Sequence, residues 1–142
     1  MLYTQDRNRM RGYFFEVWRK HRLGSALDPL EAIVAEIMVQ HPEYHAMLDY
    51  PGANLDRDYP PEFGETNPFL HLSLHIALRE QITTNRPRGI GEIYKNLTSR
   101  AGDGHETAHR MIECLAEMIW TAQRNGVAPE ETIYLDCLRK LL

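Results

Sequence analysis

Cysteine is scarce in this sequence. Only Cys114 and Cys137 occur among its 142 residues, and they lie far apart, without a Cys-x-x-Cys motif. Zinc sites built on cysteine, and scaffolds held by several disulfides, need more cysteines at characteristic spacings. We therefore expect neither, and we expect both cysteines to act as small buried hydrophobic residues.

Long hydrophobic runs are missing as well. No stretch approaches the roughly 20 apolar residues that a membrane-spanning helix requires. Residues 1–7 also lack the layout of a secretory signal, in which charges precede an apolar segment. We expect a cytoplasmic protein with no membrane partner.

A third absence is the alternation of apolar and polar residues that marks β-strands. Helical signals are present instead: Asp28–Pro29 and Asn67–Pro68 are typical helix starts, and glycines follow several apolar segments. We predict an all-α fold in a single domain over residues 1–142, a bundle of about five or six helices. Their predicted ranges are 4–23, 29–41, 67–84, 89–100, 103–125 and 129–142, with one long irregular loop at 49–66.

The net charge of -4 is unevenly distributed. Six basic and two acidic residues lie within residues 1–24, so the remainder of the chain is strongly acidic. A basic helix can contact nucleic acid, but it more often contacts acidic residues of its own domain. We do not expect nucleic-acid binding.

The strongest chemical signal comes from histidine. Six of the seven histidines form three pairs with the same spacing of four residues: His41 with His45, His71 with His75, and His105 with His109. Random placement would give about 0.3 such pairs. Residues four apart share one face of a helix, so each pair can direct two imidazoles toward one metal ion.

The helical phase of these pairs points them inward. His41 falls within the apolar stripe of its predicted helix, and His71 and His75 lie on a helix that is apolar nearly all round. Pro42 lies between His41 and His45 and weakens the argument for that pair, because proline disfavours helical geometry in the preceding residue.

The pattern predicts a metal centre inside a helical bundle, with a divalent transition metal, zinc or iron, as cofactor. The candidate ligands are the paired histidines and one carboxylate a turn beyond the last pair: His41, His45, His71, His75, His105, His109 and Glu113. The residues predict neither a substrate nor a reaction, so whether the protein is an enzyme stays open.

Two other interpretations remain open. The segment HisGluThrAlaHis at residues 105–109 has the His-Glu-x-x-His form of zinc hydrolases, in which the glutamate activates water. Its position just after Gly104 is atypical, and Glu106 is equally explained by helix capping from Asp103. In the other interpretation the histidines are structural core residues of a non-enzymatic interaction module. Its basic first helix, which carries four aromatic residues, or its Pro-rich loop binds a protein or nucleic acid, or the first helix forms a homodimer.

Four segments carry a resemblance to a known family: Thr4–Arg7, His41–His45, Asn67–His75 and His109–Ala116. On these segments, over essentially the whole chain, the sequence resembles a proteobacterial family catalogued as a domain of unknown function. The resemblance implies a small, all-helical, cytoplasmic bacterial protein. It implies no established activity or ligand set, so the functional hypothesis depends on the histidines.

Overall fold

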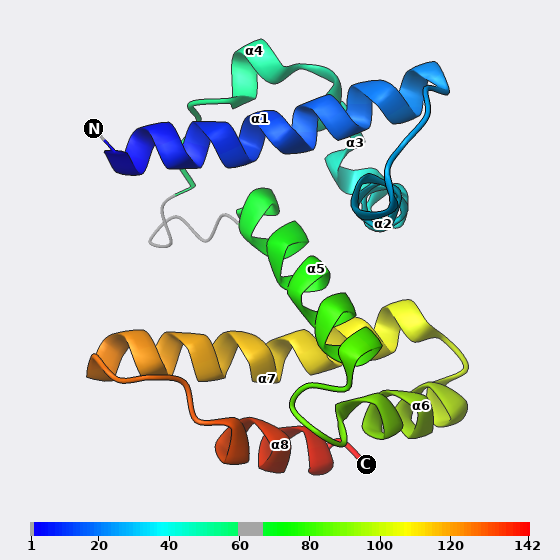
Figure 1. Ribbon diagram of the computed structural model, residues 1–142, viewed down its shortest axis with the longest axis vertical. Coiled ribbons are helices and arrows are strands. Elements are labelled where there is room, and N and C mark those ends of the chain that lie inside the picture. The colour runs from blue at the N-terminus through cyan, green and yellow to red at the C-terminus, as the bar shows by residue number, and fades with distance from the viewer. Residues whose placement is uncertain (1, 60–66) are drawn as a thin grey trace. The chain divides into compact units, whose positions relative to one another are not determined.

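A computed structural model describes residues 2–59 and 67–142 of the protein (Figure 1). These residues form eight α-helices and one 3-10 helix and contain no β-strand, which confirms the all-α prediction. The elements are α1 (Leu2–Leu23), α2 (Pro29–Val39), η1 (Pro42–Tyr44), α3 (His45–Asp49), α4 (Pro51–Asn54), α5 (Pro68–Thr84), α6 (Ile90–Ala101), α7 (Gly104–Asn125) and α8 (Glu131–Arg139). All six predicted helices are present. The two additional α-helices, beyond the six predicted, are the short helices α3 and α4.

The predicted irregular loop at residues 49–66 is partly helical. Residues 51–54 form α4 and residues 55–59 are irregular, whereas residues 60–66 lie outside the described part of the chain. No described helix has the length and apolar character needed to cross a bilayer.

Two compact units make up the chain. The first unit is Met1–Leu72 and the second unit is Ser73–Leu142. The division falls inside α5, so this one helix carries side chains of both units. The single-domain organisation over residues 1–142 stays a prediction.

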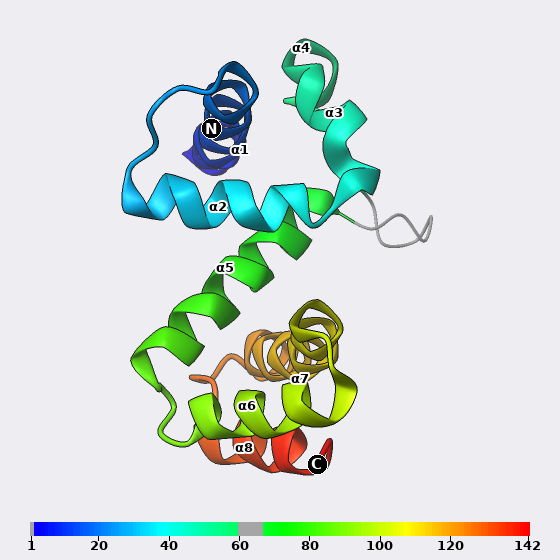
Figure 2. The same cartoon turned by 90° about the vertical axis from the view of Figure 1, so that its right-hand side faces the viewer.

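In the first unit, α1 packs against α2 and α3, and α2 crosses α1 at a steep angle (Figure 2). A capping box starts α2: the Asp28 carboxylate accepts a hydrogen bond from the Glu31 amide, and the Glu31 carboxylate accepts one from the Asp28 amide. Three of the four aromatic residues at positions 13–18 of α1 are buried in this unit, namely Phe14, Phe15 and Trp18. Packing in the core thus accounts for most of the aromatic side chains that led us to consider a partner for the first helix.

The basic residues of α1 bind groups within the same unit. Arg7 forms an ion pair of 2.8 Å with Asp58, and Lys20 forms one of 2.9 Å with Glu31. Arg11 is almost fully buried, and its guanidinium donates hydrogen bonds to the backbone carbonyls of Leu55 and Arg57. The basic side chains of α1 therefore bind the segment after α4 and the start of α2 through ion pairs and hydrogen bonds.

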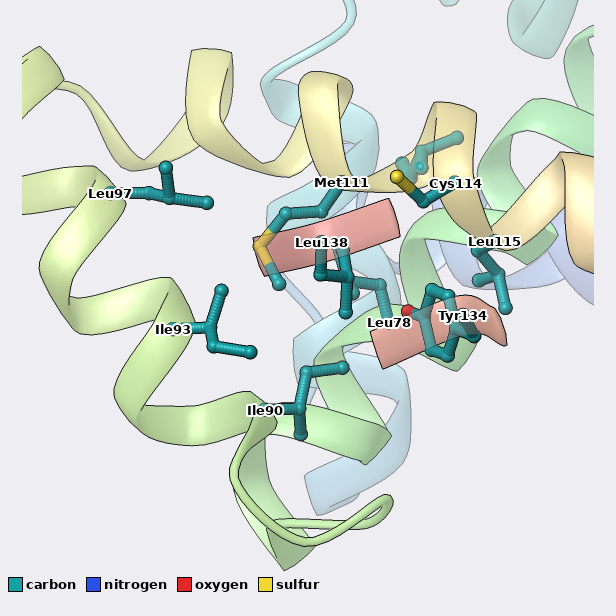
Figure 3. Packing of buried hydrophobic residues seen from close by; sticks show 10 residues of the cluster. Leu78, Ile90, Ile93, Leu97, Met111, Cys114, Leu115, Tyr134 and Leu138 are labelled. Carbon is teal, nitrogen blue, oxygen red and sulfur yellow. The ribbon is translucent and has the colours of Figure 1, made fainter. Parts of the chain in front are cut away.

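The second unit has an apolar core formed by α5, α6, α7 and α8 (Figure 3). Three of its residues, Ile90, Met111 and Leu138, have no exposed surface. Tyr134 is also buried, and its hydroxyl donates a 2.7 Å hydrogen bond to the Gln81 side chain. Burial raises the pKa of Tyr134 well above its ordinary value, so the hydroxyl stays protonated and can donate.

The two cysteines correct one prediction. They form a disulfide between α7 and α8, with 2.09 Å between the sulfur atoms of Cys114 and Cys137. The expectation of two separate buried hydrophobic side chains is therefore wrong. The pairing could not be predicted from the sequence, because the cysteines are 23 positions apart and meet only where α8 packs against α7.

Candidate metal centre

His41 lies at the end of α2 and has no exposed surface. Pro42 disfavours helical geometry at His41, and its backbone (φ -122°, ψ 68°) leaves the helix there. The Nδ1 atom lies 2.7 Å from the Ile37 carbonyl oxygen. Because a carbonyl can only accept, Nδ1 donates this hydrogen bond, and in the neutral ring the lone pair is then on Nε2. Metal-binding histidines commonly have this arrangement, in which a backbone carbonyl fixes the tautomer.

His71 is the second histidine of the first unit. It lies in the first turn of α5, where the Asn67 side chain accepts hydrogen bonds from the amides of Phe69 and Leu70 and so caps the helix. The His71 ring meets the His41 ring edge to face, with 5.1 Å between the centroids. The first unit therefore brings together two imidazoles that are 30 residues apart in the chain.

Tyr44 completes this part of the site. Its ring stacks parallel to the His41 ring at 5.4 Å and meets the His71 ring at 6.1 Å. Burial, with a smaller effect from the Glu43 carboxylate, raises the pKa of Tyr44 above its ordinary value. Tyr44 is thus a neutral phenol that packs against the two histidines. Sequence reasoning missed this role, although Tyr44 stands between the two histidines of the first pair.

Three histidines come together in the second unit. His75 on α5 is buried, and its ring lies 5.5 Å from that of His105 and 4.8 Å from that of His109. The rings of His105 and His109 are 4.2 Å apart. These two belong to the first turns of α7, which starts where the Asp103 carboxylate accepts a hydrogen bond from the His105 amide.

The helix α5 carries both His71 and His75. His71 and His75 are four residues apart in one uninterrupted helix, so their side chains lie on the same face. One ligand nitrogen of each of His41, His71, His75 and His109 lies within 4.8 Å of the others, so these four histidines could hold a metal ion. The described residues thus contain a histidine cluster of the kind that the spacing predicted.

The structure does not bring His45 into this set. Its Nε2 atom donates a 2.8 Å hydrogen bond to the Met38 carbonyl, and its ring lies over Trp18 with 4.5 Å between centroids. The reason is the break at Pro42: α2 ends at Val39 and α3 begins at His45, so His41 and His45 do not share a helix face.

Two other predicted ligands also lie outside the four-histidine set. Glu113 is exposed on α7, one turn beyond His109. His105 packs against His75 and His109 without belonging to the set. Of the seven predicted ligands, four form the set, and the other three, His45, His105 and Glu113, lie outside it.

Glu106 is the residue on which the zinc-hydrolase interpretation depends. It is exposed in the first turn of α7, where a negative charge favours the helix dipole. Asp103 caps this helix through the His105 amide. The favourable interaction with the helix dipole is sufficient to explain an acidic residue at this position. Glu106 does not belong to the four-histidine set.

Neither the curated proteins nor the solved structures contain a match to this chain. A family model described as a domain of unknown function matches residues 6–140, which is nearly the whole sequence. The chain belongs to this family, DUF1841.

Proposed function

We propose that this protein binds one divalent transition-metal ion through His41, His71, His75 and His109. The observation that carries the proposal is the set of four imidazoles, each with a ligand nitrogen within 4.8 Å of the others. The Ile37 carbonyl supports it further, because it holds His41 in the tautomer that presents Nε2 as a ligand.

The closeness of these rings favours a metal over purely structural histidines. One ligand atom of each of the four histidines lies within 4.8 Å of the others, and His41 and His75 are buried. One metal ion would coordinate a nitrogen of every ring in the set. A single ligand would then explain why several histidines lie close together.

The donor set favours zinc. Four neutral imidazoles suit the tetrahedral coordination that zinc adopts in structural sites. Iron sites in helical bundles usually include several carboxylates. The set contains none, since Glu113 lies outside it. We therefore place zinc ahead of iron.

The same donor set argues for a structural or metal-holding role. Catalytic zinc sites keep one position open for water and use three protein ligands. Four histidines fill a tetrahedral ion, which leaves no position for a hydrolytic water. The function supported best is thus that of a metal-binding helical domain in which the ion stabilises the fold.

Metal analysis of matched variants tests the proposal. We expect protein purified from zinc-replete cells to contain one equivalent of zinc per chain, and His71→Ala and His109→Ala to contain almost none. His21→Ala is the matched control, because His21 is exposed on α1 and packs only beside Trp18 among the ring contacts described. Retention of zinc by both ligand variants, or its absence from the wild type, would overturn the proposal.

A further inference from the structure

The disulfide of the second unit lines a groove. The groove has a volume of about 560 Å³ and lies between α7, α8 and the segment that connects them. Both Cys114 and Cys137 line it, together with apolar and charged side chains. A small thiol that enters this space would therefore meet the disulfide.

The two sulfur atoms are not equally accessible. Cys114 is 3% exposed and belongs to the apolar core, whereas Cys137 is only partly buried and packs at the edge of that core. Acidic residues, namely Glu117, Glu130 and Asp136, line the groove together with Lys140, so charge does not distinguish the two sulfurs. Thiol–disulfide exchange also depends on access to the attacked sulfur. Cys137 is thus the sulfur that an incoming thiol should reach.

The position of α8 does not depend on the disulfide alone. Tyr134 and Leu138 are buried to 1% and 0% exposure in the apolar core. The hydrogen bond from the Tyr134 hydroxyl to Gln81 adds a polar contact between α8 and α5. These contacts would keep α8 in place after reduction, so the pair could be opened and closed without unfolding the unit.

We infer that Cys114 and Cys137 form a reversible redox pair, with Cys137 as the site of mixed-disulfide formation. The thiolate of an incoming dithiol attacks the Cys137 sulfur, the bond between the cysteines breaks, and Cys114 leaves as a thiolate that takes up a proton. The second thiol of the dithiol then displaces Cys137, which is also protonated. The dithiol loses two electrons and becomes a disulfide, and the two cysteines gain them.

The predicted location in the cytoplasm agrees with this inference. Disulfides of cytoplasmic proteins are usually transient and take part in catalysis or redox sensing. A pair that opens into a groove, beside helices that hold their positions independently, suits such a role. The inference is separate from metal binding, since neither cysteine belongs to the four-histidine set.

Single-cysteine variants test the assignment. Cys114→Ser retains the Cys137 thiol and Cys137→Ser retains the Cys114 thiol, and each is treated with a neutral pyridyl disulfide whose released thiopyridone is followed by absorbance. We expect the Cys137 thiol to react at least about tenfold faster, because it is more exposed than the Cys114 thiol. Equal rates, or faster reaction of Cys114, would overturn the assignment.

The wild-type protein supplies a second test that needs no substitution. We expect dithiothreitol to reduce the disulfide without denaturant, to add two hydrogens to the intact mass, and to leave the far-ultraviolet circular dichroism unchanged. Removal of the dithiol under a mild oxidant should restore the disulfide. A disulfide that is reduced only in denaturant, or a loss of helix on reduction, would contradict a reversible pair.

Discussion

The two units use the same histidine spacing in different ways. In the first unit, α2 ends at Val39, and the 3-10 helix that begins at Pro42 separates His41 from His45. Each of these two rings binds a backbone carbonyl of α2. In the second unit, His105 and His109 stay on one uninterrupted helix, and their rings lie 4.2 Å apart. A spacing of four residues thus brings side chains together only where the helix continues between them.

The units also differ in what holds them together. Both units have buried apolar residues. The first unit adds charged groups of α1, such as Arg11 and Lys20, that bind carbonyls or carboxylates. The second unit adds a disulfide between α7 and α8. Substitutions in the two units should therefore differ in their cost and in their dependence on pH.

The largest expected effect is the difference in zinc-induced stabilisation between a variant of a proposed ligand, His109, and a variant of His45, which lies outside the four-histidine set. Zinc at a thousandfold excess over its Kd should stabilise the wild type by about 4 kcal/mol, because the ion binds the folded state. We expect His109→Ala to lose this response and His45→Ala to retain it, although His45→Ala lowers the melting temperature by loss of packing on Trp18. Calorimetry with and without zinc measures both. A zinc response lost in His45→Ala would show that His45 is a ligand.

The next effect concerns the apolar core of the second unit. Leu138→Ala should lower the free energy of unfolding by about 2 to 5 kcal/mol, because it leaves a cavity at a fully buried position. Ile133→Ala on the same helix is the control; its side chain is 58% exposed and should change stability by less than about 0.5 kcal/mol. Urea denaturation gives both values. Similar costs for the two variants would mean that α8 does not hold the core.

A smaller loss is expected from the polar contacts of the first unit. Arg11→Ala should cost about 1.5 to 3 kcal/mol, since two carbonyls lose hydrogen bonds from a charged donor. Arg9→Ala, at an exposed position on the same helix, serves as the control. If denaturation shows equal stability for the two variants, the guanidinium of Arg11 does not hold the segment after α4.

The smallest effect is a dependence on pH. The Asp28 amide and then Lys20 lower the pKa of Glu31 below its ordinary value of 4.5. A carboxylate with a lowered pKa in the folded state contributes stability above that ordinary value, and the contribution disappears as the pH falls through the folded pKa. Glu31→Gln should therefore show a shallower loss of melting temperature below pH 4.5 than the wild type. Parallel acid profiles for the two proteins would contradict this assignment.

Much of the fold could be predicted from local signals. Asp28–Pro29, Asn67–Pro68 and Asp103 mark helix starts because each cap depends on residues within one turn. Gly24 and Gly102 adopt positive φ after α1 and α6, as expected for residues that end helices. These interactions are short in sequence, so pattern and propensity are sufficient to locate them.

The candidate site was predictable only in part. His41, His71, His75 and His109 were all among the predicted ligands, because helical spacing and apolar context identify rings that point inward. The role of His45 was not predictable from spacing, since it depends on where Trp18 packs. The disulfide was missed for a similar reason, because Cys114 and Cys137 meet only through tertiary packing.

X-ray absorption at the zinc edge of the zinc-loaded protein tests the central claim most directly. The account predicts a first shell of four nitrogen atoms at about 2.0 to 2.1 Å, with the outer-shell scattering typical of imidazole rings. A first shell that contains sulfur or is mainly oxygen would contradict the four-histidine site, as would a protein that retains no zinc.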